Sequence, residues 1–404
     1  MNAAGLALFA VCYAMLSARR LAGRGLDRPT IALLGATLMV AFGVLTPAGA
    51  LASIDANTLL LLFGLMGVGA AIAEDGLFAW AEARMVAVAR TPARLVGAVL
   101  WGSGLAAALL TNDAVCLLAA PPLIRLVQRH RLPAAPFLLA LATGANTGSA
   151  ATLLGNPQNM LCASLGDLNY LDHLRLAGPV ALLGLAVNHA VLAASFRGVL
   201  TQEPLQVELS AAPRRWRVHA LVLVGLVMAV SLGADLAWSS AGAFVAVVIA
   251  RGQDVRTLYP RIDFSLLLFF AGLFTLVSGF HVSGGPAWLF AHAPLTLASD
   301  DLPGWSVLAA KLLVGSNLVS NVPFILIVRD AMNALPTPTR GWELLAMAST
   351  FAGNLTLFGS VANLIVAEAA RDVGGLGFWQ HLRVGAPVAL LTTALAVVGV
   401  VWAG

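Results

Sequence analysis

Four long apolar stretches of this 404-residue sequence are interrupted by polar residues, which are the side chains best suited to bind a solute. The interruptions contain Thr111, Asn112 and Asp113; Gly155, Asn156, Gln158 and Asn159; Ser320 and Asn321; and Gly359, Ser360 and Asn363. Each interruption places helix-capping residues directly before an apolar run, which predicts that a helix begins there. Helix starts offer free N–H groups and positive partial charge, and amide side chains add further donors and acceptors. We therefore predict that these residues bind a small oxyanion or oxyacid.

Asp113 is the acidic residue of this set and lies within the apolar segment 95–128. A charged group is costly inside a membrane, so an acid retained there is expected to be functional. Helix capping alone is the simpler alternative. The four interruptions contain no arginine, so a dianion would lack a guanidinium partner. We predict that Asp113 carries a proton, and that the solute is a neutral weak acid or an anion whose entry requires that proton.

Other polar residues in apolar segments are expected to serve structure. Asparagines outside the interruptions are expected to form helix–helix hydrogen bonds; they are Asn146, Asn188, Asn317 and Asn354. Asp55 and Asp263 begin apolar segments and are expected to cap helices. Six histidines near segment ends are expected to have no special role: His130, His173, His219, His281, His292 and His381. His189 lies within a segment and stays a weaker candidate for proton transfer.

The composition determines the class of protein. Hydrophobic residues make up 59% of the chain and charged residues 10%, and the mean hydropathy is +0.88. Soluble domains carry about a quarter charged residues, so this chain is predicted to lie in a membrane. Its net charge of +4 comes from arginines scattered singly through short loops, which argues against nucleic-acid binding. Three cysteines in apolar stretches suggest neither a disulfide framework nor a metal site.

The apolar segments predict an all-α polytopic membrane protein. Segments long enough to cross are 3–17, 30–47, 57–73, 134–165, 175–196, 217–234, 237–251, 264–281, 341–368 and 383–402. These segments predict about ten spans. Two of them, 134–165 and 341–368, contain interruptions and are predicted to be broken helices. Segments 95–128 and 304–330 are also interrupted midway, and we predict that each forms a re-entrant hairpin whose tip lies inside the membrane.

The arginines predict the orientation. Nineteen fall in loops on one side of the predicted topology and three, Arg175, Arg329 and Arg340, on the other. The positive-inside rule therefore places both termini outside the cytoplasm. A chain rich in alanine, with Lys311 as its only lysine, is typical of a bacterial inner (cytoplasmic) membrane.

Sequence matches between the two halves predict a duplication. Ile54-Asp55 recurs as Ile262-Asp263, 208 residues later, and the tips Asn112 and Asn321 are 209 apart. We divide the chain into a first repeat (1–197), a cytoplasmic linker (198–216) and a second repeat (217–404). Each repeat is predicted to cross five times, so the second is inverted. Inverted repeats with paired interrupted helices are typical of secondary transporters.

Enzyme motifs are absent from the sequence, including HExxH, GxSxG and the P-loop, so we predict that the chain is not an enzyme. Neither a cofactor nor a metal is expected. Without an ATP-binding motif, uphill transport has to draw on an ion gradient.

Three stretches, Leu110–Cys116, Ala142–Met160 and Gly353–Asn363, together resemble the ion transporter superfamily. The resemblance is greatest to arsenite efflux permeases and plant silicon efflux transporters, and weaker to sodium/proton antiporters and sodium-coupled divalent-anion symporters. It implies a fixed scaffold, a moving domain that holds both hairpins, elevator-like alternating access and, commonly, a homodimer. The divalent-anion branch binds sodium with Ser-Asn-Thr at both tips. Here the tips read Thr111-Asn112-Asp113 and Ser320-Asn321-Val322, and an acid in place of hydroxyls favours the proton over sodium as coupling ion.

The resulting hypothesis is a proton-coupled antiporter that exports a small weak oxyacid, such as arsenite or silicic acid. Alternatives within the class are a sodium- or proton-coupled anion uptake permease and a sodium/proton antiporter. A channel is the alternative from another class, and it predicts flux without saturation or coupling.

Overall fold

The computed structural model describes residues 2–17, 27–200, 205 and 211–402, and every regular element in that part of the chain is helical. Arg19, Arg20 and Arg24 of the orientation argument, and 201–204 and 206–210 of the linker, lie outside the described residues. The first half contains α1 (Ala3–Ser17), α2 (Arg28–Ala41), α3 (Pro47–Ala52), α4 (Ala56–Glu74), α5 (Leu77–Ala89), α6 (Pro92–Leu109), α7 (Asn112–Arg129), α8 (Ala134–Ser149), α9 (Pro157–Gly166) and α10 (Tyr170–Ser195). The second contains α11 (Trp216–Ser231), α12 (Leu236–Arg251), α13 (Phe264–Val282), α14 (Gly285–His292), α15 (Leu302–Val319), α16 (Asn321–Asn333), α17 (Pro338–Ala352), α18 (Val361–Ala369) and α19 (Phe378–Trp402), with short 3₁₀ turns at Val255–Thr257, Tyr259–Arg261 and Arg371–Val373.

All-helical architecture is confirmed, and six of the described helices are long and apolar enough to cross a membrane: α4, α6, α10, α13, α15 and α19. The prediction of one span over 30–47 is wrong. Helix α2 ends at Ala41, Gly43 adopts a left-handed φ of +70°, and Pro47 begins the separate helix α3. Helices α5 and α14 were not predicted. They are short, and their apolar residues had been counted as loop.

The predicted breaks are present. Thr111 caps α7 by accepting a hydrogen bond from the Ala114 N–H, and Asn156 caps α9, whose first residue is a proline. Ser360 caps α18 in the same way. At the third break, Ser320 separates α15 from α16 with a φ of +72°, which is rare for serine. The location of each break is therefore confirmed, whereas the return of each hairpin to its own side of the membrane stays a prediction.

The order of helices recurs along the chain. Helix α4 begins at Ala56 and α13 at Phe264, 208 residues later, and α10 and α19 begin at Tyr170 and Phe378, again 208 apart. The inverted relation of the two halves and the domain boundaries at 197 and 216 stay predictions.

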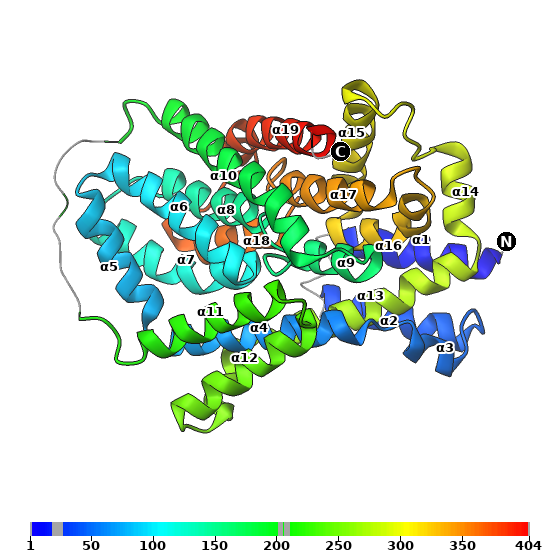
Figure 1. Ribbon diagram of the computed structural model, residues 1–404, viewed down its shortest axis with the longest axis horizontal. Helices are drawn as coiled ribbons and strands as arrows, with labels where there is room; N and C mark the ends of the chain where they lie inside the picture. Colours follow the sequence, from blue (N-terminus) through cyan, green and yellow to red (C-terminus); the bar gives the residue numbers. More distant parts are fainter. Residues whose placement is uncertain (1, 18–26, 201–204, 206–210, 403–404) are drawn as a thin grey trace.

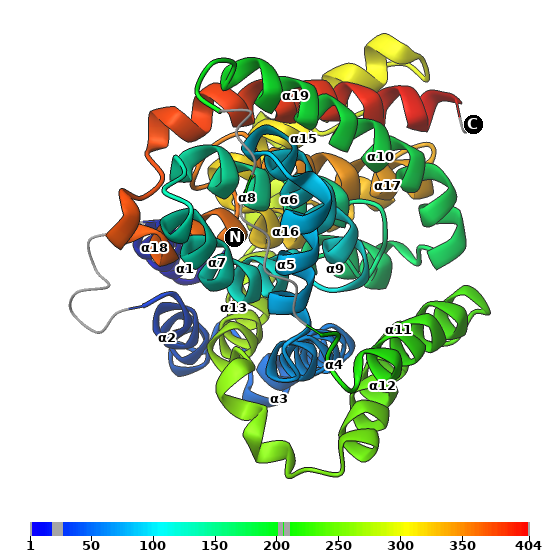
Figure 2. The ribbon, with the colours of Figure 1, turned by 90° about the vertical axis from the view of Figure 1, so that its left-hand side faces the viewer.

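The helices form two layers (Figures 1 and 2). Along the lower side of both views lie α2, α3, α4, α11, α12 and α13, and above them lie α6 to α10 and α15 to α19. Within the lower layer, helices of the first half pack against helices of the second half: α4 packs against α12, and α2 packs against α13. A Cβ on Gly64 would lie 2.5 Å from the Ser240 backbone, and one on Gly272 would lie 2.7 Å from that of Ala32. These glycines are 208 residues apart and let the two helix pairs approach closely.

A buried charge cluster holds the end of α4 against α11 and α12. The Arg251 guanidinium donates to Asp75, and His219 Nε2 lies 2.8 Å from the same carboxylate. The side chains of Arg251 and His219 are 2% and 0% exposed, and that of Asp75 is 10% exposed. The fold thus buries His219 beside an acid that lies 144 residues away, which gives this histidine a structural role.

Asp75→Asn is expected to lower stability strongly, because it leaves the buried Arg251 charge without its counter-ion. Breaking such a pair typically costs about 3–5 kcal/mol. The neighbouring Glu74→Gln is the matched control. Glu74 pairs with Arg261 at the surface, with side chains 37% and 43% exposed, and exposed pairs contribute about 1 kcal/mol or less. Thermal unfolding in detergent should separate the two variants, and equal midpoints would contradict a structural role for the cluster.

Candidate functional site

The four breaks lie in the upper layer and are paired crosswise between the halves. Helix α7, which begins at the first break, packs against α18, which begins at the fourth. Helix α16, which begins at the third, packs against α9, which begins at the second. Each pair therefore joins helix starts that are far apart in the sequence, so the breaks can act on one another through direct contacts.

Asn146 on α8 joins the first break to the fourth. Its Oδ1 accepts from Asn112 Nδ2 at 2.8 Å and from Ser360 Oγ at 3.1 Å. Its Nδ2 donates to Asn363 Oδ1 at 2.9 Å and to Asn354 Oδ1 at 3.1 Å. The side chain is fully buried. Asn146 thus forms the helix–helix hydrogen bonds expected of it, but it forms them to predicted site residues, and sequence reasoning had placed it outside the site.

The second break has a comparable cluster. Asn156 donates from Nδ2 to Thr350 Oγ1 at 3.1 Å, and Thr350 donates to Asn159 Oδ1 at 3.0 Å. Asn159 Nδ2 donates to the carbonyl oxygen of Thr152 at 2.9 Å. Thr350 lies 204 residues after Asn146, so the two clusters occupy corresponding positions in the two halves.

Gly155 and Gly359 act through their backbones. A Cβ on Gly155 would lie 2.0 Å from the Ser149 carbonyl oxygen, which only glycine avoids. The Gly155 carbonyl accepts from the Asn112 N–H at 2.9 Å and so ties the first break to the second. A Cβ on Gly359 would lie 3.0 Å from the Ala352 carbonyl oxygen. Close backbone packing accounts for both glycines.

Asp113 lies at the interface between the layers. It is 9% exposed and lies on α7, which packs against α18. Its Oδ1 is buried and has no hydrogen-bond partner among the described residues. Asp113 and Thr111 line a small cavity of about 20 Å³ together with Arg261 and Asp263 from the other half. A buried carboxylate oxygen without a donor is costly, so this position suits a group that gains and loses a proton.

The second hairpin tip lines a different cavity. Ser320 and Asn317 face a space of about 210 Å³ that is also lined by Arg28, the first residue of α2, and by Tyr13 of α1. Asn321 accepts from Ser316 Oγ at 2.7 Å, within its own hairpin. The sequence argument that the solute would lack a guanidinium partner is therefore wrong. Arg28 begins α2 and Arg261 precedes α13, and only folding brings them to the tips.

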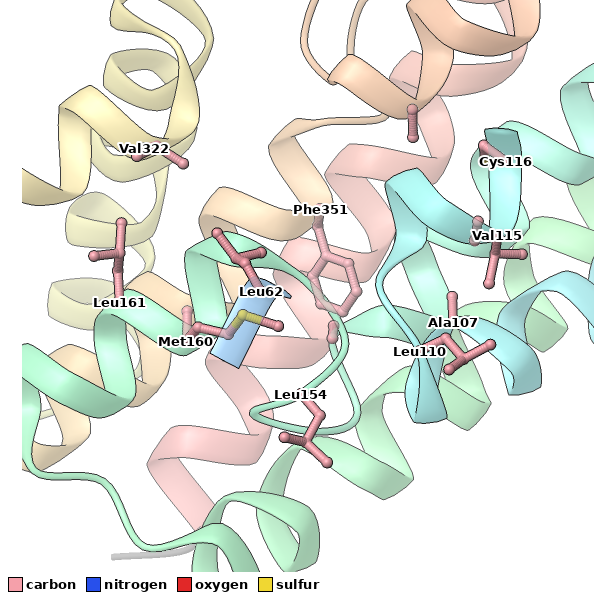
Figure 3. Packing of buried hydrophobic residues seen from close by; sticks show 14 of the residues in the cluster. Leu62, Ala107, Leu110, Val115, Cys116, Leu154, Met160, Leu161, Val322 and Phe351 are labelled. Atoms are coloured by element: carbon pink, nitrogen blue, oxygen red, sulfur yellow. The ribbon is translucent and has the colours of Figure 1, made fainter. Parts of the chain in front are cut away.

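The two tips line separate cavities, and Asn112, Asn156, Asn159 and Asn363 are used in hydrogen bonds to one another's segments. Gln158 is buried at 7% exposure beside them. Apolar side chains fill the space between the breaks, among them Leu110, Leu154 and Met160 (Figure 3).

Three further residues were missed as candidates. His173 and His381 are fully buried, and each contacts a backbone carbonyl oxygen of a broken helix, whereas Glu343 contacts His173. His173 and His381 are 208 residues apart, which is the offset of the repeat, and this spacing was visible in the sequence. His189 accepts a hydrogen bond from Trp101 Nε1 at 3.1 Å on the α6–α10 side, away from the breaks. As predicted, Asp55 and Asp263 cap α4 and α13.

Comparison with known proteins gives consistent matches over nearly the whole chain. A family model described as "CitMHS: Citrate transporter" matches residues 13–352. The silicon efflux transporter LSI3 of Oryza sativa subsp. japonica is 31% identical, with 92% of this chain and 92% of that protein covered. The putative transporter arsB of Dictyostelium discoideum is 24% identical over 94% of this chain and 88% of that protein. The crystal structure of the Alcanivorax borkumensis YdaH transporter superposes with a TM-score of 0.52 at 15% identity, over 93% of this chain and 97% of that chain, and this shows a shared fold.

Proposed function

We propose that this chain, which belongs to the CitMHS citrate transporter family of the ion transporter superfamily, is an antiporter that exports a small weak oxyacid in exchange for protons. The family and its relatives are transporters, so the chain is a multi-pass membrane transporter and the prediction that it is not an enzyme is confirmed. The solute, the coupling ion and the direction of transport belong to the proposal.

Asp113 is the observation that carries the proposal. It is a buried acid at the start of α7, and its Oδ1 has no hydrogen-bond partner among the described residues. When ionised, this oxygen can accept a hydrogen bond from a hydroxyl group of the neutral oxyacid. A proton on the carboxyl group removes this acceptor, so solute and proton compete for one position. Competition of this kind is what an exchange of solute for protons requires.

The amide clusters support a neutral oxyacid as solute. Asn112, Asn146 and Asn363 offer donors and acceptors without net charge, which suits the hydroxyl groups of undissociated arsenite or silicic acid. The printed names of two relatives, a silicon efflux transporter and a putative arsB transporter, agree with this class of solute.

A carboxylate or another small anion is the second candidate. Arg28 lines the cavity at the second tip, and no acid among its lining residues balances that guanidinium. Arg261 is a weaker anion site, because Glu74 accepts from its Nε at 2.7 Å and Asp263 lines the same cavity. The family name, citrate transporter, agrees with an anionic solute.

The architecture supports an alternating-access mechanism. We infer two inverted repeats, 1–197 and 217–404, in which the hairpins 95–128 and 304–330 and the broken helices 134–165 and 341–368 belong to a moving domain. The layer that contains α4, α12, α2 and α13 would then be the scaffold. A homodimer is part of this proposal.

The same proposal places both termini outside the cytoplasm and the protein in the inner membrane. Arg28 and Arg261 would then mark the cytoplasmic ends of α2 and α13. Because both arginines line the tip cavities, this structure would have its binding region turned toward the cytoplasm.

Purified protein in liposomes with an imposed pH gradient would test the function. Arsenite, silicic acid, citrate, phosphate, sulfate and sodium would be followed one at a time, with and without the gradient. Uphill, saturable movement of a neutral oxyacid against a proton flux is the expected result. Proton-driven movement of citrate or another anion would select the second candidate, and gradient-independent, non-saturating flux would mean a channel.

A further inference from the structure

Two buried histidines occupy corresponding positions in the two halves. His173 lies in the first turns of α10 and His381, 208 residues later, in those of α19, and both are fully buried. His173 Nε2 is 3.1 Å from the carbonyl oxygen of Ala150, and His381 Nε2 is 2.9 Å from that of Asn354. These carbonyls begin the segments that separate α8 from α9 and α17 from α18. Each histidine therefore holds one end of a broken helix.

The two sites differ at the other ring nitrogen. His173 Nδ1 lies 2.6 Å from Glu343 Oε2 on α17, and the Glu343 side chain is 7% exposed. His381 Nδ1 is buried without a partner among the described residues. The position that corresponds to Glu343 in the first half, 204 residues earlier, is Leu139. Only one of the two histidines thus has an acid beside it.

The contacts of His173 require a specific number of protons. A carbonyl oxygen only accepts, so Nε2 must carry a hydrogen to bond Ala150. The 2.6 Å contact with Glu343 needs a second proton, on Nδ1 or on the carboxyl group. If that proton leaves, the neutral ring keeps a single N–H and Glu343 is a carboxylate. The ring then adopts the tautomer with its hydrogen on Nδ1, because the carboxylate is a stronger acceptor than the carbonyl oxygen, and the bond from Nε2 to Ala150 is lost.

The pair connects a surface groove to the second break. Glu343 lines a groove of about 650 Å³ between α10, α17 and α19. The charged groups there are Asp172, Arg175 and Arg340. Asp172 and Arg175 pair at 3.2 Å and Arg340 pairs with Asp300, while the Cys162 thiol on α9 lies on the buried side of Glu343. These pairs leave Glu343 as the acid that links the groove to His173.

On the side away from the groove, the hydrogen bond of His173 to Ala150 is connected to predicted site residues. The Ala150 carbonyl that faces His173 also accepts from Asn159 Nδ2 at 3.4 Å. Asn159 and Asn156 share the bonds to Thr350 described above. Loss of the His173 bond would therefore loosen the segment 150–156.

We propose that His173 and Glu343 form a second proton-binding site, separate from Asp113, which holds the segment 150–156 in place when protonated and releases it when deprotonated. The pair acts by positioning the α8–α9 break rather than by touching the solute. The inference rests on the proposed function only in assigning this break to the solute path.

Hydrogen–deuterium exchange of the full-length protein tests this inference without any flux measurement. The protection factor of peptides covering 150–160, corrected for intrinsic exchange, is expected to fall roughly tenfold or more in the wild type between about pH 6 and about pH 9. Glu343→Gln should abolish this response. Its amide donates to Nδ1 while Nε2–H still bonds Ala150, so both contacts persist without a titrating proton.

The control is Glu368→Gln, which removes a surface acid paired with Arg371 and should leave the wild-type response unchanged. His173→Gln, a second variant that removes the titrating ring, is expected to give protection that does not vary with pH. Constant protection in the wild type, or a wild-type response in Glu343→Gln, would overturn the inference. Asp113→Asn should keep the exchange response, so a failure of proton-coupled export leaves this result standing and identifies the proposed function as the part that failed.

Discussion

Asp113→Asn is expected to abolish accumulation driven by a pH gradient while leaving the protein folded. Asparagine is favoured at helix starts as much as aspartate and nearly matches it in shape, but it cannot bind and release a proton. For each coupled proton, a gradient of one pH unit sustains a roughly tenfold solute gradient. In liposomes the wild type should approach that ratio, and the variant should equilibrate the solute to a ratio near one.

Downhill exchange measured without a pH gradient provides the internal check. It should survive in Asp113→Asn, because the helix starts and amide clusters are intact. Asp235→Asn is the matched control, because Asp235 caps α12 at the surface by accepting from the Trp238 N–H at 2.8 Å. Full proton-driven accumulation by Asp113→Asn would show that Asp113 is a helix cap and that coupling lies elsewhere.

Asn146→Ala is expected to have the second large effect, a loss of transport on the order of a hundredfold or more, because several buried partners lose their hydrogen bonds at once. Asn112 and Ser360 lose their acceptor, and Asn354 and Asn363 lose their donor. The first and fourth breaks, which this side chain joins, then have no common anchor. Initial rates of solute exchange in liposomes would measure the loss.

Asn188→Ala separates this effect from ordinary destabilisation. Asn188 is also a fully buried asparagine, but its hydrogen bonds go to Thr143 and Thr147 on α8 and not directly to a predicted site residue. We expect both variants to unfold at lower temperature and only Asn146→Ala to lose transport. If the two variants lost transport in proportion to their stability, Asn146 would be a structural residue like Asn188.

Much of the helical framework could be predicted from the residues, because the signals are local. Apolar runs of sufficient length, the caps Thr111, Asn156 and Ser360, and Pro157 at a helix start all act within a few residues of one another. The helix boundaries at the breaks therefore agree with prediction. The segment 30–47 failed because a turn at Gly43 is compatible with an apolar composition.

The contents of the candidate site depended on contacts that no spacing rule describes. Arg28 begins α2 and Arg261 precedes α13, and neither carries a local sign that it faces a hairpin tip. Asn146 resembles any asparagine in an apolar helix, and its importance comes from partners up to 217 residues away. His173 and Glu343 are separated by 170 residues and meet only because α10 packs beside α17. The residues alone were sufficient to predict the all-helical class and the helix boundaries at the four breaks, since capping and hydropathy are local properties. The tertiary structure decided which charges and amides meet, because side-chain contacts between distant segments depend on how the helices pack.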